Sequence, residues 1–390
     1  MTPSVSPAVD VAIVGSGPSG ASAALRLAQS GLSVVLLDKA PFPRYKACGG
    51  GVVRRAARLL PFDIGEAIEH ECQRIELKLL ESNLTFAQER QRSIISMVMR
   101  SRFDQLLASA AREAGAKCLH QCEAQDIQPQ NGCISLKTGR GWIKAQYIIA
   151  ADGALSTIAR KLYPTDQRLL FPALECEVVC APGQFKSFAG CARFDFDLVP
   201  DGYGWIFPKS DHLSVGVLLM SRRRASLWQI FLRYLNLLKL DAPRSITPYG
   251  AIIPLASRSR PFMKNRVLLV GDAAGFADPL TGEGITAAIL SGQIAADALI
   301  NGRLEIERVQ NIFESELERE ILSELRFSLS LSRFVYRFPN MRTALFRIAG
   351  NKLAAAMTRV FSGERTYSEQ LRDPVNYFKL FAPQTPSMQP

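Results

Sequence analysis

The sequence predicts an α/β protein in which a discontinuous Rossmann-like domain is joined to an antiparallel-sheet domain and a helical C-terminal region. Three observations lead to this prediction. They are a strand, turn and helix near the N-terminus, a second apolar strand that ends in a carboxylate, and two later buried-type strands that begin near residues 146 and 266. A chain of 390 residues, 47% of them hydrophobic, is long enough to bury a core for two or more domains.

A glycine-rich turn follows the first predicted strand. Residues 9–14 have the length and composition of a strand, residues 21–29 read as a helix, and between them stands Gly15-Ser16-Gly17-Pro18-Ser19-Gly20. Gly15 permits the tight turn, Gly17 lets a pyrophosphate approach the backbone at the helix N-terminus, and Gly20 lets the helix pack closely on the strand. The turn therefore predicts a site for a dinucleotide.

A second apolar run, residues 32–37, ends in Asp38 and is followed by Lys39. Asp38 stands near the spacing at which a carboxylate accepts hydrogen bonds from a ribose. Because two strands and the acid surround the glycine motif, an ordinary glycine-rich turn is the weaker explanation. We therefore place Asp38 and the adjoining Lys39 in the cofactor site.

Later junctions bring more polar groups to strand ends. Arg100 stands where a strand leads into a helix, and there it can reach a cofactor phosphate or hydroxyl group; the alternative is a solvated charge, which the helix dipole disfavours. Asp152-Gly153 follows another apolar strand, although Asp-Gly alone is a common turn. Gly271-Asp272 ends a further buried strand, where the aspartate can hold a ribityl hydroxyl group.

The last junction, Gly282-Glu283-Gly284-Ile285, opens a helix whose free N–H groups form a positive end. Such an end stabilises negative charge on a reduced isoalloxazine ring. Taken with the earlier motifs, it predicts FAD as the cofactor.

The net charge of +11 suggests an acidic partner. Residues 321–360 contain one acid, Glu324, and the bases Arg326, Arg333, Arg337, Arg342, Arg347, Lys352 and Arg359, interleaved with apolar residues. This pattern is typical of a basic amphipathic helix on an anionic membrane, and core packing of a terminal helix is the open alternative. We expect no nucleic acid partner, because no binding signature accompanies the charge.

The N-terminus has no basic stretch followed by an apolar segment, and no apolar run is long enough to cross a bilayer. We therefore expect a cytoplasmic protein, with contact to the inner face of the membrane left open. The pairs Cys118/Cys122 and Cys176/Cys180 lack the second cysteine pair or histidines of a zinc site, so buried free thiols and no metal are expected.

The order of these motifs resembles that of the flavoprotein hydroxylase superfamily, whose fold is shared with para-hydroxybenzoate hydroxylase. The resemblance implies FAD and a discontinuous FAD-binding domain, which we place at residues 1–72, 99–165 and 262–305. A substrate domain at 73–98 and 166–261 and a helical C-terminal region at 306–390 complete the expected organisation, with the linker that returns to the FAD domain near Arg258–Pro261 and a frayed tail at Pro383–Pro390.

Two further elements are similar to those of the geranylgeranyl reductase family: a Cys-Gly-Gly element, Cys48-Gly49-Gly50, and a Tyr-x-Trp-x-Phe-Pro element, Tyr203 to Pro208. The resemblance spans about residues 8 to 305. One departure is visible, because of the Gly-x-Gly that the family commonly has after the second element only Gly216 remains. The pocket beside that strand is therefore expected to differ.

This resemblance implies an FAD-dependent oxidoreductase that reduces carbon–carbon double bonds of a geranylgeranyl or other prenyl chain, with NADPH or reduced ferredoxin as electron donor. Cys48 is then the candidate proton donor, with a packing thiol as the alternative. Tyr203 and Trp205 face one side of a strand and are the candidate wall for the prenyl chain, unless they are core aromatics. The bases Arg44, Lys46, Arg54 and Arg55 suit a diphosphate or NADPH, or plain surface charge.

Rival functions remain open. A flavin monooxygenase of an aromatic or polyketide substrate shares the fold, although the Cys-Gly-Gly and Tyr-x-Trp-x-Phe-Pro elements argue against it, and the paired tryptophans of flavin halogenases are missing. A non-catalytic, membrane-docked flavoprotein electron carrier is the rival from another class. The sequence does not distinguish a free prenyl diphosphate from a lipid or a chlorophyll side chain, and it does not indicate an oligomeric state.

Overall fold

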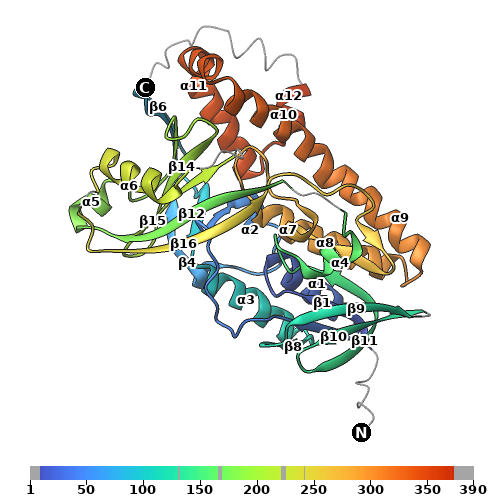
Figure 1. The fold of residues 1–390 in the computed structure, drawn as a ribbon. Coiled ribbons are helices and arrows are strands. Elements are labelled where there is room, and N and C mark those ends of the chain that lie inside the picture. The colour runs from blue at the N-terminus through green and yellow to red at the C-terminus, as the bar shows by residue number, and fades with distance from the viewer. Residues whose placement is uncertain (1–8, 131, 166–168, 221–224, 241, 373–390) are drawn as a thin grey trace.

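The structure is a computed structural model that describes residues 9–130, 132–165, 169–220, 225–240 and 242–372. Within these residues the chain forms two large β-sheets, a small third sheet and a group of C-terminal helices (Figure 1). The tail predicted at Pro383–Pro390 lies outside the described residues.

The first sheet contains the parallel strands that the N-terminal motif predicts. Its strands are β1 (Val9–Val14), β2 (Val34–Leu37), β8 (Lys117–Leu119), β9 (Ala124–Gln130), β10 (Cys133–Thr138), β11 (Gly141–Ala150), β17 (Met263–Lys264) and β18 (Val267–Leu269). The order is β17-β18-β11-β1-β2-β8, and β10 pairs with both β11 and β9. β18, β11, β1, β2 and β8 run parallel, which brings their carboxyl ends to one edge of the sheet.

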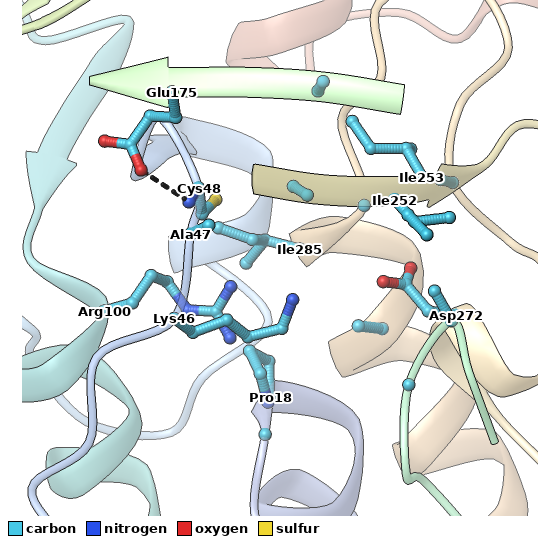
Figure 2. A pocket seen from close by; sticks show the side chains of 18 of the residues that line it. Pro18, Lys46, Ala47, Cys48, Arg100, Glu175, Ile252, Ile253, Asp272 and Ile285 are labelled. Atoms are coloured by element: carbon cyan, nitrogen blue, oxygen red, sulfur yellow. Dashed lines mark hydrogen bonds between the residues drawn. The ribbon is translucent and has the colours of Figure 1, made fainter. Parts of the chain in front are cut away.

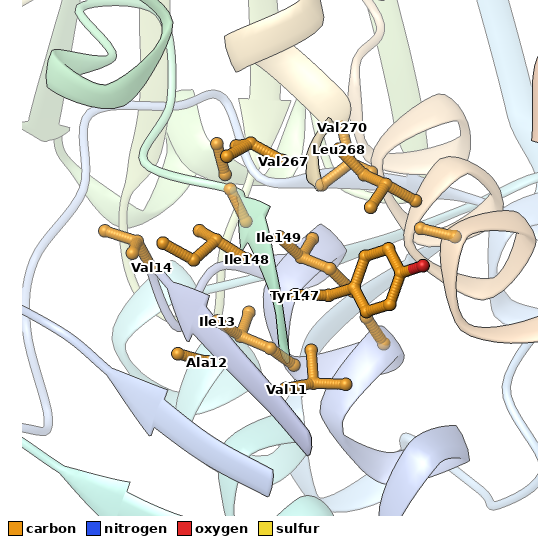
Figure 3. Close-up of a cluster of buried hydrophobic side chains, with 14 of the residues drawn as sticks. Val11, Ala12, Ile13, Val14, Tyr147, Ile148, Ile149, Val267, Leu268 and Val270 are labelled. Carbon is orange, nitrogen blue, oxygen red and sulfur yellow. The ribbon is translucent and has the colours of Figure 1, made fainter. Parts of the chain in front are cut away.

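The parallel strands are buried on both faces, which explains why they read as nearly continuous apolar runs. Val11, Ile13 and Ile148 have no exposed surface, and Leu268 from β18 joins the same core (Figure 3). The distant segment at 267–269 is therefore an integral part of the domain that begins at Val9.

Three helices cover this sheet: α1 (Pro18–Gln29), α3 (Arg100–Glu113) and α8 (Ile285–Asn301). A Cβ atom at Gly20 would lie 1.9 Å from the carbonyl oxygen of Gly15, and one at Gly292 would lie 2.1 Å from the carbonyl oxygen of Ser19. Glycine is therefore required where α1 meets its own turn and where it meets α8. The shorter helices are α2 (Arg54–Ala57), α4 (Thr157–Leu162), α5 (Pro182–Lys186), α6 (Leu227–Leu237), α7 (Gly271–Ala274) and the 3-10 turn η1 (Gly65–Ala67).

The second sheet is built from two separate parts of the chain. Its strands are β5 (Arg74–Leu79), β6 (Leu84–Glu89), β12 (Leu170–Val179), β13 (Cys191–Phe196), β14 (Gly202–Pro208), β15 (Leu213–Leu219) and β16 (Ser245–Pro254). The order is β16-β12-β15-β14-β13-β5-β6. The pairing is antiparallel, as predicted, except between β13 and β5, which run parallel because the two parts of the chain meet there.

The small third sheet has the order β3-β7-β4, from β3 (Gly51–Val53), β4 (Ile68–Cys72) and β7 (Ile95–Val98). β7 thus pairs with strands from residues 51–72 and not with β5 or β6, which precede it. The sheet places Gly50 and Val98 side by side, since the Val98 N–H donates a hydrogen bond of 2.8 Å to the Gly50 carbonyl.

The C-terminal region is helical, as predicted. It consists of α9 (Ile306–Leu317), a π-helical turn η2 (Glu318–Leu322), α10 (Ser323–Arg337), α11 (Pro339–Ser362) and α12 (Tyr367–Arg372). α11 lies against β5 and β6, and a Cβ atom at Gly350 would lie 2.3 Å from the Phe86 ring. A search of the described residues finds no helix that combines the length and the apolar character needed to cross a membrane.

Candidate active site

A cavity of about 1020 Å³ lies between the carboxyl edge of the first sheet and one face of the second sheet. This is the position at which open α/β sheets bind ligands. The cavity gathers most of the residues that the sequence predicts for the cofactor and for catalysis: Gly15, Gly17, Pro18, Ser19, Asp38, Lys39, Cys48, Gly49, Gly50, Arg100, Asp152, Gly153, Tyr203, Trp205, Asp272, Gly282, Gly284 and Ile285. Gly20 and Gly271 do not line it; both are buried in helix packing.

The glycine turn forms an open cradle at one end of the cavity. Gly15 has a φ of +103°, and a Cβ atom there would lie 2.3 Å from the carbonyl oxygen of Ala151. At Gly17, by contrast, the nearest heavy atom to a Cβ would be an Arg44 nitrogen at 3.8 Å, so the backbone at the start of α1 stays accessible. Pro18 is the first residue of α1, and the helix N-terminus has no side-chain cap. A pyrophosphate fits this arrangement.

Asp38 follows β2 directly, lines the cavity and is buried. Its Oδ2 atom accepts a hydrogen bond of 2.9 Å from the Ser16 N–H, and its Oδ1 atom accepts one of 3.0 Å from the Ala40 N–H. Asp38 thus also holds the glycine turn in shape.

Asp152 lines the cavity and also binds the start of a helix. Its Oδ2 atom accepts hydrogen bonds from the N–H groups of Thr157 at 2.8 Å and Ile158 at 3.3 Å, at the start of α4. Burial raises the pKa of the Asp152 carboxyl group, although these hydrogen bonds oppose the rise. α4 begins directly after Ser156, whose hydroxyl caps the helix by accepting a hydrogen bond of 2.9 Å from the Ala159 N–H.

Arg100 takes part in a buried ion pair that the sequence analysis missed. Its Nε and Nη2 atoms lie 2.8 and 2.9 Å from the two oxygens of Asp104, which has no exposed surface, and Arg44 reaches the same carboxylate at 3.0 Å. Burial opposes protonation of Arg100, but Asp104 and the nearby Cys48 outweigh it and raise the pKa of Arg100. The spacing of Arg100 and Asp104, four residues apart on a predicted helix, was the available signal.

Two of the four predicted bases pair with carboxylates of the protein, whereas Lys46 extends into the cavity. Arg44 lies 3.4 Å from Asp38 and Arg55 lies 3.4 Å from Glu283, so both bind carboxylates of the protein. Lys46 is exposed and extends into the cavity near Pro18 and Arg100 (Figure 2).

The opposite end of the cavity is formed by Asp272 and the start of α8. Gly284 is the N-cap of that helix and Ile285 its first residue, which confirms the predicted helix start. The preceding loop is held by the Tyr203 hydroxyl, which donates to the Thr281 carbonyl. Burial raises the pKa of Tyr203, so the hydroxyl keeps its proton.

The Cys-Gly-Gly element packs directly on the Tyr-x-Trp-x-Phe-Pro element. A Cβ atom at Gly49 would lie 2.9 Å from the Phe207 ring and 3.0 Å from Trp205 Nε1. Lys209, which is fully buried at the end of β14, donates hydrogen bonds to the carbonyls of Gly49 at 2.7 Å and Val98 at 2.9 Å. Cys48 is therefore held at the wall of the cavity by its neighbours.

Aromatic rings line the part of the cavity beyond Cys48. Tyr203 and Trp205 point to one side of β14, as predicted, with ring centroids 6.2 Å apart. Phe194 lies 5.9 Å from Tyr203, and Phe207 and Phe361 complete this wall. The glycine between the two predicted residues admits Tyr234 of α6, because a Cβ atom at Gly204 would lie 2.6 Å from that ring. The group that lies close to the strand backbone at Gly204 is therefore the Tyr234 ring, on the face of β14 opposite Tyr203 and Trp205.

Glu175 of β12 is a second residue that the sequence analysis missed. It is 1% exposed, lines the cavity, and accepts a hydrogen bond of 3.2 Å from the Cys48 N–H. Two glutamates at period two in an otherwise apolar strand, Glu175 and Glu177, were the signal that pointed to it.

Comparison with known proteins identifies the cofactor and the family. Residues 8–181 match the FAD binding domain family. A digeranylgeranylglycerophospholipid reductase of Methanothermobacter thermautotrophicus is 30% identical over 351 residues, which cover 84% of this chain and 87% of that protein. A menaquinone reductase of Mycobacterium tuberculosis is 29% identical over 319 residues, which cover 76% of this chain and 78% of that protein.

A solved structure shares the fold. It is that of a geranylgeranyl bacteriochlorophyll reductase-like protein from Thermoplasma acidophilum, with a TM-score of 0.79 and 22% identity over 94% of this chain and 99% of that chain. The sequence relatives, the FAD binding domain and the fold agree with the cradle and the cavity described above: this protein is an FAD-dependent oxidoreductase and belongs to the geranylgeranyl reductase family.

Proposed function

We propose that this protein reduces carbon–carbon double bonds of a prenyl chain. The observation that carries the proposal is the continuity of the cavity, which runs from the glycine cradle past Cys48 to the aromatic wall at Tyr203 and Trp205. An apolar chain suits that wall, and a dinucleotide suits the cradle. The two sequence relatives, one a digeranylgeranylglycerophospholipid reductase and the other a menaquinone reductase, support a lipid substrate.

The proposal assigns a role to each end of the cavity. Residues 15–19 and Asp38 would hold the pyrophosphate and ribose of FAD, while Asp272 and residues 282–285 would hold its flavin end. When bound and reduced, FAD would supply a hydride, and a proton must complete the addition to the double bond. Cys48 provides that proton, and the faces of Tyr203 and Trp205 stabilise positive charge that develops on the prenyl carbon.

We propose NADPH or a reduced ferredoxin as the electron donor. Lys39 and Lys46 support this, because they are exposed cations at the cavity and complement either a phosphate or an acidic protein surface. Arg44 and Arg55 are already engaged by carboxylates.

We also propose that α10 and α11 contact an anionic membrane surface. Phe338, Met341 and Ile348 are 47%, 54% and 63% exposed, next to the exposed bases Arg337 and Arg347. Arg342 does not contribute, since it is buried and paired with Asp197.

The test is anaerobic. The FAD-loaded protein is reduced with dithionite, mixed with geranylgeranyl diphosphate, a digeranylgeranylglycerophospholipid or menaquinone, and followed by flavin absorbance and mass spectrometry of the lipid. We expect flavin reoxidation with a gain of two hydrogens per double bond for at least one lipid. Stable reduced flavin with all three lipids contradicts the proposal, and oxygen uptake with an aromatic substrate would favour a monooxygenase in its place.

A further inference from the structure

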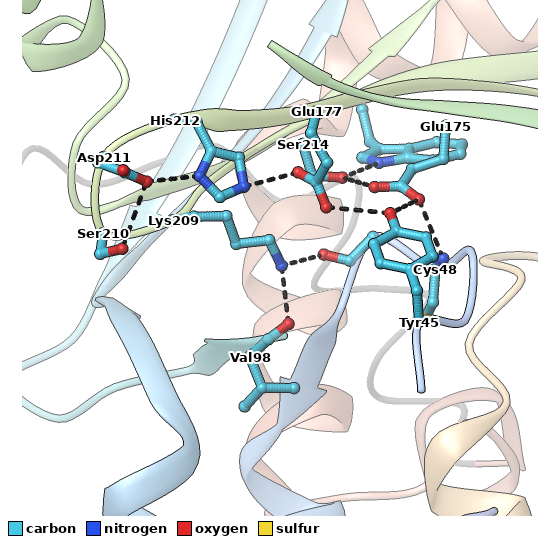
Figure 4. Close-up of polar contacts among 12 residues, drawn as sticks. Tyr45, Cys48, Val98, Glu175, Glu177, Lys209, Ser210, Asp211, His212 and Ser214 are labelled. Carbon is cyan, nitrogen blue, oxygen red and sulfur yellow. Dashed lines mark hydrogen bonds and ion pairs between the residues drawn. The ribbon is translucent and has the colours of Figure 1, made fainter. Parts of the chain in front are cut away.

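The hydroxyl group of Tyr45 contacts the side chains of both Glu175 and Glu177. They stand on the same face of β12, and the Tyr45 hydroxyl lies 2.8 Å from Glu175 Oε2 and 3.1 Å from Glu177 Oε1 (Figure 4). A tyrosine has one O–H proton and so can donate to only one of these carboxyl groups. For both contacts to be hydrogen bonds, one of the two carboxyl groups must itself carry a proton.

The second oxygen of Glu177 identifies which carboxyl group that is. Glu177 Oε2 lies 2.8 Å from His212 Nε2, and His212 Nδ1 lies 2.6 Å from Asp211 Oδ1. His212 forms a hydrogen bond with Asp211 and an ion pair with Glu177, and both contacts favour a protonated histidine. Glu177 is thereby paired as an anion, which leaves the proton on Glu175.

The row of groups connects solvent to the cavity. Asp211 is at the surface, with 83% of its side chain exposed, whereas Glu175 is buried in the cavity wall. The Cys48 N–H donates to the same Glu175 oxygen that meets Tyr45, and Ser214 Oγ lies 3.1 Å from the other oxygen. Every link between Asp211 and Glu175 is within hydrogen-bond distance.

We propose that Asp211, His212, Glu177, Tyr45 and Glu175 form a proton relay that supplies the reaction at the Cys48 side of the cavity. This inference rests on the proposed function, because it requires a reaction that consumes a proton. It adds a source of protons for later turnovers, because Cys48 has only one S–H proton to give.

The electrostatics agree with this order. Burial, and then the charge of Glu177, raise the pKa of Glu175, so it holds a proton closer to neutral pH than an ordinary glutamate. Burial opposes ionisation of Glu177, but His212 outweighs it and lowers the pKa of Glu177. Burial and both carboxyl groups raise the pKa of Tyr45, so Tyr45 passes protons by giving one as it receives another.

Three other titratable groups, Tyr249, Cys176 and Lys209, lie near Glu175 and stay outside the proposed proton path. Tyr249 of β16 is its partner in the sheet and stacks on Tyr45, and Cys176 is the next residue of β12. Lys209 is a buried cation, and burial lowers its pKa even though both glutamates favour its charge. Its two hydrogen bonds are to backbone carbonyls, so it fixes the Cys48 loop and does not join the relay.

One turnover moves one proton through the relay and no electrons. Cys48 gives its proton to the new C–H bond, and Glu175 gives its own proton to the Cys48 thiolate. His212 then passes a proton to the Glu177 carboxylate, which passes it to Tyr45 as Tyr45 gives its own proton to Glu175, so Glu177 is again an anion. His212 regains a proton from solvent beside Asp211, so each group returns to its starting state, and the electron pair arrives with the hydride described above.

The first experiment needs no turnover. Infrared spectra of the FAD-loaded protein are recorded from about pH 5 to about pH 9 for the wild type, Glu175→Gln and His212→Gln. We expect a protonated-carboxyl band that disappears as the pH rises, is absent in Glu175→Gln, and has a shifted midpoint in His212→Gln. Absence of such a band in the wild type, or an unchanged band in Glu175→Gln, overturns the relay.

The second experiment separates stored from resupplied protons. Pre-reduced protein is mixed with the prenyl substrate for a single turnover and compared with continuous turnover. We expect Glu175→Gln to leave the first turnover intact, because Cys48 already carries its proton, and to slow later turnovers about 100-fold with a flattened pH profile. His212→Gln leaves the first turnover intact and slows later ones, because only resupply passes through His212.

His70→Gln is the matched control, because His70 is half-buried, hydrogen-bonded to the Gly190 N–H at 2.8 Å, and outside the relay. It should match the wild type in both phases. If His212→Gln also matches the wild type in both phases, the relay is wrong. A wild type that reduces no prenyl substrate but shows the titrating band contradicts the proposed function and still supports the proton on Glu175.

Discussion

Gly216 on β15 lies directly opposite Trp205 on β14, and a Cβ atom at Gly216 would sit 2.0 Å from atom Cζ2 of the indole ring. The ring therefore lies across the backbone of the neighbouring strand. This explains in physical terms why Gly216 remains where the family commonly has two glycines. Without a side chain at residue 216, the indole can lie flat enough to donate from Nε1 to Ser214 Oγ at 3.4 Å.

Gly216→Ala should displace Trp205. Because the strand backbone cannot yield, we expect a loss of about 1–3 kcal/mol in the free energy of unfolding, measured in urea, and a changed near-ultraviolet circular dichroism spectrum. Gly183→Ala is the control, because a Cβ atom at Gly183 meets nothing within 4 Å. Equal stability of the two variants would show that Trp205 does not depend on Gly216.

Asp104→Asn should destabilise the protein more than loss of an exposed ion pair. It leaves Arg100 and Arg44 without their shared buried anion, so we expect a loss of about 3 kcal/mol in the free energy of unfolding of the FAD-free protein. Asp297→Asn breaks the exposed pair with Arg26 and should cost at most about 1 kcal/mol. Similar losses in both variants would contradict the importance of the buried pair.

Cys48→Ser tests the proton donor. Serine is a far weaker acid than cysteine but nearly the same size, so the oxidised-flavin spectrum should persist while anaerobic reoxidation by prenyl substrate slows about 100-fold. Cys133→Ser, in β10 and outside the cavity, should behave as the wild type. An unchanged rate in Cys48→Ser would leave Cys48 as a packing thiol.

His212 and His70 should affect stability with opposite dependence on pH. Burial opposes protonation of His212, but Glu177 and Asp211 outweigh it and raise its pKa, so its contribution is fully present below its ordinary pKa, about 6.5, and is lost as the pH rises through the folded-state value. Burial lowers the pKa of His70, so its contribution is lost as the pH falls. His212→Gln should therefore cost most stability in acid, and His70→Gln most in alkali, in urea titrations across this range; parallel profiles would refute the assignment.

Phe338→Ser combined with Met341→Ser tests membrane contact. We expect the wild type to sediment with vesicles of phosphatidylglycerol and phosphatidylcholine, less so in high salt, and the variant to bind about tenfold more weakly. Ile306→Ser, which removes an apolar side chain that is also exposed but lies on α9, is the control. Wild-type binding by the Phe338 and Met341 variant would place any membrane contact elsewhere.

Local patterns predicted much of the fold. The strand and glycine turn at Val9–Gly20, the start of α8 at Ile285 and the shared face of Tyr203 and Trp205 follow from short-range periodicity and turn chemistry. The limits of the elements were less accurate: α1 begins at Pro18 and not Ala21, because proline is already suited to the first helical turn.

Contacts across the chain were not predictable in the same way. The meeting of Arg44 with Asp104, and of Tyr45 with Glu175, depends on how a loop crosses between two sheets. Nothing local marks Arg342 as buried, since its partner Asp197 lies in another part of the chain. The polar half of the candidate site therefore became visible only in three dimensions.

The position of β18 has a consequence for how the protein is made. β1 ends at Val14 and belongs to the first part of the chain, whereas β18 begins at Val267 and is followed by Asp272 and α8, which close the far end of the cavity. The N-terminal strands leave the ribosome long before these residues are synthesised. FAD can thus be enclosed only after translation has passed Ile285, and until then β11 lacks its partner strand β18 and exposes that part of its edge.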